Sequence, residues 1–192
     1  MPELSQLEIK LAEVMGLAQA AKDSTAKVKK LVEDEEVRQT LDRMRAEAAE
    51  TAERCEELAG ELEGKKSALR RKARESKAEA REMMSTYLSD DVDALDGLEF
   101  LLMAEAGELG HVEIVGAMNE QAGDPRIRQL VEWARPIQER HFQDTRAADV
   151  EEFYEGALAL AAAHDVAIVG GDTSASASGW MINITLLGEA TA

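Results

Sequence analysis

Apolar side chains recur every three or four residues along most of the chain, which is the spacing of one helical face. The segments 3–33 and 35–63 each carry such a series. The first series is Leu4, Leu7, Leu11, Val14, Ala18, Ala21, Val28 and Val32, and the second is Val37, Leu41, Met44, Ala48, Cys55, Leu58 and Leu62. Gly64 is a C-terminal stop for the second helix. Because only the acidic run EDEE at 33–36 joins the two segments, we expect an antiparallel hairpin.

A second hairpin is predicted further along. The segment 92–122 carries a stripe of Leu95, Leu98, Leu102, Leu109 and Val112. Asp90 and Asp91 precede it, where a cap and first-turn acids belong. The run Gly-Asp-Pro at 123–125 ends this helix.

The segment 126–148 predicts the fourth helix, with a stripe of Ile127, Leu130, Ala134, Ile137 and His141. Pro136 lies inside this pattern and predicts a kink, because proline removes a helical hydrogen bond. The segment 149–163 reads as a fifth helix or as a continuation of the fourth. Both alternatives are open.

The segment 65–90 between the hairpins has a different character. It carries a basic block of Lys65, Lys66, Arg70, Arg71, Lys72, Arg74, Lys77 and Arg81, and its apolar stripe is thin. Its residues favour a helix. We expect a solvent-exposed connection that crosses between the hairpins and lies on the acidic helices, rather than a nucleic-acid-binding patch.

The last part of the chain is predicted to form strands rather than helices. DVAIVGG at 165–171 predicts a buried strand running into a glycine turn, and WMINITLLGE at 180–189 predicts a second strand. The predicted fold class is mainly α: a four-helix bundle with a long crossover, plus a short C-terminal helix and a two-strand α/β appendage. The predicted division is a helical bundle at 1–148 and a helix-strand-turn-strand tail at 149–192.

The charge, the cysteine count and the lack of long apolar runs exclude several classes of function. The formal net charge of −17 over 192 residues opposes binding to nucleic acid and to an anionic membrane. Cys55 is the only cysteine, which excludes an internal disulfide and a multi-cysteine zinc site. The N-terminal residues lack the pattern of a secretory signal, and no apolar run reaches membrane-spanning length. We therefore expect a cytoplasmic protein.

The predicted third and fourth helices carry candidate metal ligands. Glu108 and His111 form a Glu-x-x-His pair, so both side chains face the same way on a helix. Glu105 lies one turn earlier on the apolar stripe, and His141 continues the stripe of the fourth helix, with Gln138 as its i−3 partner.

The stretch MAEAGELGHVEIVGAMNEQAGDPRIRQLVEWARPIQERHFQD at 103–144 resembles the second half of ferritin-like bacterial proteins. That resemblance covers about 3–146 and implies a bundle that holds iron or another divalent metal on Glu105, Glu108, His111 and His141. The second helix has Glu47, Glu50 and Glu53 but no histidine, and Gln138 replaces an acid, so the ligand set of the family is incomplete.

The tail EEFYEGALALAAAHDVAIVGGDTSASASGWMINITLLGEA at 151–190 resembles an internal piece of thiamine-monophosphate kinase. The resemblance implies that Gly171 contacts ATP, that Asp172 binds the accompanying Mg²⁺ and that Thr173 lines the same loop. Most of such an enzyme lies outside this segment, so the resemblance implies at most a residual Mg-ATP turn.

Three functions follow from these readings. The first is a ferritin-like helical-bundle protein that is non-enzymatic or binds metal weakly, with iron oxidation as its activity if it is an enzyme. The second is a kinase-related fragment with a residual ATP–Mg²⁺ turn. The third is a scaffold that forms a homo-oligomer through the bundle or the C-terminal strand, whose unpaired edge favours association.

Overall fold

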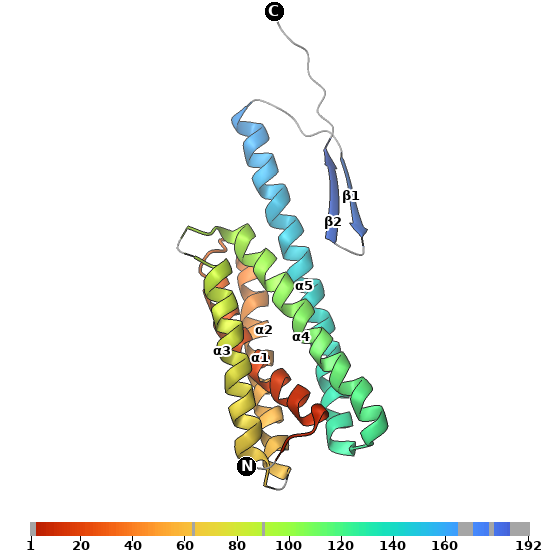
Figure 1. Cartoon of the computed structure of the whole chain (residues 1–192). Coiled ribbons are helices and arrows are strands. Elements are labelled where there is room, and N and C mark those ends of the chain that lie inside the picture. The colour runs from red at the N-terminus through yellow and green to blue at the C-terminus, as the bar shows by residue number, and fades with distance from the viewer. Residues whose placement is uncertain (1–2, 63, 90, 165–170, 177–178, 185–192) are drawn as a thin grey trace, which may run out of the picture. The chain divides into compact units, whose positions relative to one another are not determined.

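The structure is a computed structural model that describes residues 3–62, 64–89, 91–164, 171–176 and 179–184. The chain is mainly helical, as predicted (Figure 1). It divides into two compact units, Met1–Val150 and Glu151–Ala192. The described helices are α1 (Gln6–Val28), α2 (Glu35–Glu61), α3 (Lys66–Tyr87), α4 (Ala94–Ala122) and α5 (Pro125–Ala163).

Helix α1 is the centre of the first unit, since it packs against α2, α3 and α4. Its start is fixed by a capping box, in which Ser5 accepts from the backbone of Glu8 and Glu8 accepts from the backbone of Ser5. The apolar face predicted for this helix is buried, with Leu11, Val14 and Ala18 all inside. Two clusters of buried apolar side chains lie along α1, one around Leu11 and one around Val28.

The basic segment packs more closely on the bundle than a fully exposed connection would. It forms α3, whose Ala68, Leu69 and Ala73 are buried. Figure 1 shows α3 running beside α1. The two backbones approach at Gly16, where a β-carbon would collide with the carbonyl oxygen of Ala73. Although its apolar stripe is thin, α3 packs on α1 because the small residues Gly16 and Ala73 let the two backbones come close.

The basic side chains of α3, and that of Lys65 directly before it, lie on acidic neighbours, as predicted. Lys65 bonds Glu8 of α1, and Arg81 bonds Asp23 of the same helix at 2.7 Å. Lys72 lies 3.3 Å from Glu13. These ion pairs neutralise part of the basic block, so its charge helps to hold α3 against α1.

The core face of α4 differs from the predicted stripe. Leu98 and Val112 are buried as expected, but Leu95, Leu102 and Leu109 are only half-buried. The buried residues of α4 are Ala94, Gly97, Leu98, Phe100, Leu101, Glu105, Glu108, Val112, Val115 and Asn119. The face of α4 that points inward therefore includes two carboxyl groups, and the surplus of leucines on this helix misled the prediction.

Both ends of α4 are set by local chemistry. The cap at its start is Asp93, which forms a capping box with Asp96, rather than Asp90 or Asp91. Asp91 is exposed in the preceding turn, and Asp90 lies outside the described residues. Gly123 ends α4 in the left-handed conformation with φ of 69°, which glycine adopts without steric cost, so the predicted break is confirmed.

Helix α5 is continuous through Pro136 and on to Ala163, so the segment 149–163 continues the fourth helix. Its buried positions in the first unit follow helical spacing: Ile127, Leu130, Val131, Ala134, Gln138, His141, Thr145 and Ala148. Ile137, which we had placed on the stripe, is half-buried, and Gln138 takes the inward position.

The second unit contains two short strands, β1 (Gly171–Ser176) and β2 (Gly179–Ile184). They pair antiparallel, with Gly171 opposite Ile184 and Ser176 opposite Gly179. The strand predicted at 165–171 lies outside the described residues except for Gly171. Of the predicted glycine turn, Gly171, Asp172 and Thr173 are extended and pair with β2, and Gly170 lies outside the described residues.

Candidate functional site

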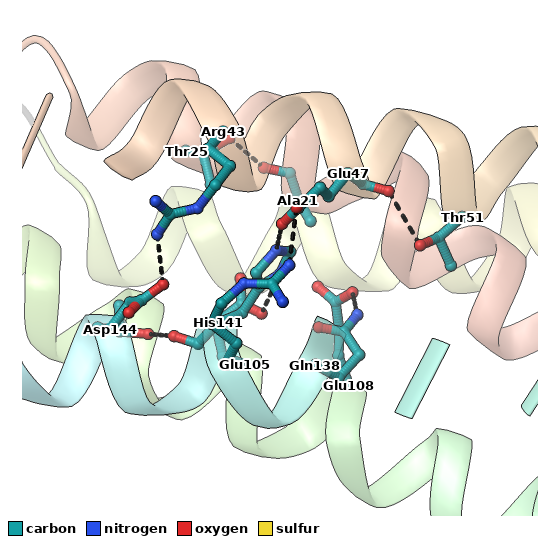
Figure 2. A network of polar contacts seen from close by, with 12 residues as sticks. Ala21, Thr25, Arg43, Glu47, Thr51, Glu105, Glu108, Gln138, His141 and Asp144 are labelled. Atoms are coloured by element: carbon teal, nitrogen blue, oxygen red, sulfur yellow. Dashed lines mark hydrogen bonds and ion pairs between the residues drawn. The ribbon is translucent and has the colours of Figure 1, made fainter. Parts of the chain in front are cut away.

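Polar side chains from three helices meet in the interior of the first unit. Glu105 and Glu108 lie one turn apart on α4, and Gln138 and His141 lie one turn apart on α5. Figure 2 shows these four side chains close together, with Glu47 of α2 approaching from the opposite side. Glu105, Gln138 and His141 are each 1% exposed, and Glu108 is 6% exposed. We call these five residues the buried polar cluster.

His141 is held between two carboxylates. Its Nε2 atom lies 2.7 Å from Oε2 of Glu47, and its Nδ1 atom lies 3.4 Å from Oε2 of Glu105. Burial by itself lowers the pKa of His141, but the attraction of the Glu105 and Glu47 carboxylates outweighs burial, and the pKa stands above 6.5. An imidazolium can donate from both ring nitrogens at once, so this geometry favours the charged form.

Glu108 has a different environment. Its Oε2 accepts a 3.0 Å hydrogen bond from the side-chain amide of Gln138. Burial and the neighbouring carboxyl of Glu105 together hold the pKa of Glu108 well above 4.5, although the bond from Gln138 opposes them. This environment favours the neutral carboxylic acid.

Two acceptor oxygens in the cluster have no hydrogen bond within the described residues: Oε2 of Glu105 and Oε1 of Gln138. The 3.4 Å between Nδ1 of His141 and Oε2 of Glu105 is an ion-pair distance and is longer than an ordinary N–H···O hydrogen bond. Buried acceptors without donors are costly, and a bound cation or water satisfies them.

Glu47 connects the cluster to the surface. Its Oε1 accepts a 2.7 Å bond from the Arg140 guanidinium, while its Oε2 faces His141. Burial raises the pKa of Glu47, but the bonds from Arg140 and His141 outweigh that effect, and the pKa stands below 4.5. Arg43 of α2 also bonds Asp144 of α5 at 2.6 Å, so ion pairs connect these helices at two levels (Figure 2).

The structure brings together three of the four predicted metal ligands. His111, the fourth, lies apart from the cluster. Its Nδ1 donates to the carbonyl of Gly107 at 2.8 Å, and its Nε2 lies 3.5 Å from Oε2 of Glu13 on α1. Glu108 and His111 share one side of α4, but Glu108 points to α5 and His111 points to α1.

Sequence reasoning did not include Glu47 or Gln138 among the site residues. A signal for Glu47 was present in the sequence, because it lies three residues after Met44 of the predicted apolar stripe. Gln138 lies one turn after Ala134 on the inward face. Their contacts depend on how α2 and α5 pack, which helical spacing alone does not determine.

Among the residues that the structure describes, no three or more His, Cys, Asp and Glu side chains are grouped as a metal site. The predicted ATP–Mg²⁺ residues Gly171, Asp172 and Thr173 lie on β1, opposite Ile184, Asn183 and Ile182.

Comparison of the chain with protein-family models, with curated proteins and with solved structures gives no match. Within the described ranges, no helix has the length and apolarity that crossing a bilayer requires.

Proposed function

We propose that this protein is a ferritin-like, non-enzymatic four-helix bundle whose buried polar cluster binds a divalent metal ion weakly, with iron as the first candidate. In this reading α1 and α2 form one hairpin and α4 and α5 form the other, with α3 as the long crossover. The short links between the paired helices and the placement of α3 against α1 support this arrangement.

The observation that carries the proposal is the pair of buried acceptor oxygens without donors, on Glu105 and Gln138. A cation placed beside them would satisfy both. The carboxyl group of Glu108 and a nitrogen of His141 lie in the same cluster and complete a mixed oxygen and nitrogen donor set. Such a set suits iron, manganese or zinc better than a metal that prefers thiolates.

The same contacts explain why we propose weak binding. A metal ion could bind His141 only by displacing both a proton and a carboxylate from one of its nitrogens, because Glu47 and Glu105 face the two nitrogens of the charged ring. Gln138 is a neutral ligand, so it contributes no charge to offset the loss of metal hydration. His111 faces α1 and would not contribute. Iron oxidation is therefore not part of the proposal.

The test is metal analysis of the full chain purified from iron-supplemented cells, followed by anaerobic titration of the metal-free protein with Fe²⁺, Mn²⁺ and Zn²⁺. We expect one ion to bind per chain in the wild type. Glu105→Gln should weaken binding by about tenfold or more, because a charged ligand is lost. Glu113→Gln is the matched control, since Glu113 is an exposed α4 residue paired with Arg135. Metal-free protein that binds none of the three ions refutes the proposal.

A further inference from the structure

A separate pocket opens between α1, α3 and α4, and it has a volume of about 250 Å³. Its walls are mainly apolar and include Met83 and Met84 of α3 with Phe100 and Met103 of α4. Met83 and Met103 are 47% and 41% exposed, so they lie at its rim. A cavity of about 150 Å³ can hold benzene, so this pocket has room for a small organic molecule. Methionine side chains adapt readily to ligands of varied shape.

Three polar side chains line this pocket: Ser24, Glu108 and His111. The Ser24 hydroxyl already donates to the carbonyl of Ala21 at 3.0 Å, and Nδ1 of His111 is bonded to Gly107. Glu108 uses only Oε2 within the described residues, in its bond with Gln138. The second carboxyl oxygen of Glu108 is therefore the polar group that the pocket offers to a ligand.

Glu108 is the one carboxyl group among the described residues that line this pocket, and a cation beside it would favour its ionised form over the neutral acid. Within the described residues, Glu47 is paired with Arg140, and Glu105 is paired with His141. Glu108 has a neutral amide as its hydrogen-bond partner and no ion pair. The remaining nitrogen of His111 faces Glu13, and the residues that line the pocket include no lysine or arginine. With a chain charge of −17, this site disfavours an anionic ligand and favours a cation.

We propose that the pocket between α1, α3 and α4 binds a small amphipathic amine, with its ammonium group on Glu108 and its alkyl or aryl body against Met83, Phe100 and Met103. The apolar body removes methionine and phenylalanine surface from water. The ammonium group would give the Glu108 carboxyl group a cationic partner, because its only hydrogen-bond partner within the described residues is the neutral amide of Gln138. This inference goes beyond metal binding, because it uses the face of Glu108 that opens toward α1 and α3.

Three probes of matched size test the head group: hexylamine, 1-hexanol and hexanoate, titrated into the full chain in the presence of a chelator and moderate salt. The chelator keeps divalent ions away from Glu108, so a failure of metal binding does not affect the result. We expect hexylamine to bind about tenfold more tightly than hexanol, because its ammonium group forms a charge-assisted hydrogen bond. Hexanoate should bind most weakly. Equal or tighter binding of hexanol or hexanoate would overturn the proposal, as would no binding of hexylamine.

Two variants locate the site. Glu108→Gln should reduce hexylamine affinity to that of hexanol, whereas Glu113→Gln should leave it unchanged. Gly107 lines the pocket, and a β-carbon there meets nothing within 4 Å, so Gly107→Phe should cover the mouth and remove binding of hexylamine and hexanol alike. Gly110→Phe is its control, because position 110 is equally open but lies outside the pocket lining. Hexylamine binding that survives both Glu108→Gln and Gly107→Phe overturns the proposal.

Discussion

The imidazole of His141 faces Glu47 across the interface of α5 and α2, with 2.7 Å between Nε2 and Oε2. Because Glu105 of α4 lies on the other side of the same ring, one side chain links three helices through charge. A buried ion pair adds little stability over well-packed apolar residues, but breaking one leaves an uncompensated charge inside the protein. The cluster therefore fixes how these helices meet.

Replacing the histidine should make this role measurable. We expect His141→Gln to lower the free energy of unfolding by about 3 kcal/mol near pH 6, because it strands the carboxylates of Glu47 and Glu105. The pKa of His141 is raised in the folded chain, so its stabilising effect is complete below its unfolded value of 6.5. That effect is lost as pH rises through the folded pKa.

Urea unfolding of metal-free wild type and His141→Gln between about pH 5.5 and about pH 9 measures this difference. The gap between the two proteins should shrink as the pH rises. His164→Gln serves as the control, because His164 lies in the second unit, outside the cluster. A gap that is constant or grows toward high pH contradicts the charged state assigned to His141.

The buried carboxyl group of Glu108 predicts a second pH dependence of stability. The raised pKa of its carboxyl group means that wild-type stability falls as pH rises from 4.5 through the folded pKa. Glu108→Gln keeps the side-chain shape and the bond to Gln138 but removes the ionisation. We expect it to stabilise the fold by about 1–2 kcal/mol near pH 8 and to have little effect near pH 4.

The measurement is chemical unfolding at both pH values, with the exposed Glu99 of α4 changed to Gln as the control. Destabilisation by Glu108→Gln at the higher pH would mean that the ionised carboxylate has a favourable partner in the fold.

The close approach of α1 and α3 predicts opposite effects of one substitution at two glycines. Gly16→Ala should destabilise the protein by about 1–3 kcal/mol, because its β-carbon would collide with the Ala73 carbonyl and lie 2.9 Å from the β-carbon of Ser76. Gly110→Ala should stabilise it by up to about 1 kcal/mol, since its β-carbon meets nothing within 4 Å and alanine favours the helix. Thermal unfolding of both variants checks this contrast, and a stabilised Gly16→Ala would show that α3 does not lie so close.

Cys55 should be unreactive in the folded protein. It is fully buried, and burial raises the pKa of its thiol to about 12. At pH 8 only about one thiol in ten thousand would then be the reactive thiolate. We expect an aromatic disulfide reagent to label native protein far more slowly than protein unfolded in guanidinium. Equal rates in the two conditions would place Cys55 at the surface.

Local patterns predicted the helices well, since the signals lie within a few residues of each helix. The apolar spacing, Gly64 and Gly123 placed the ends of α2 and α4 to within a few positions. The faces were harder to predict. The leucines of α4 lie on more than one face, so the predicted apolar stripe did not coincide with the buried face that holds Glu105 and Glu108. The many charged residues of α3 gave no sign of its contact with α1.

The sequence by itself determined that this chain is mainly helical, that its single cysteine forms no internal disulfide, and that Glu105 and His141 follow the spacing of inward faces. Only the tertiary structure decided that Glu47 and Gln138 join them, that His111 turns to Glu13 instead, and that Glu108 lies between the cluster and a pocket. The physical reason is that helical periodicity fixes the direction of a side chain around its own axis. The partner that it meets depends on how separate helices rotate and pack.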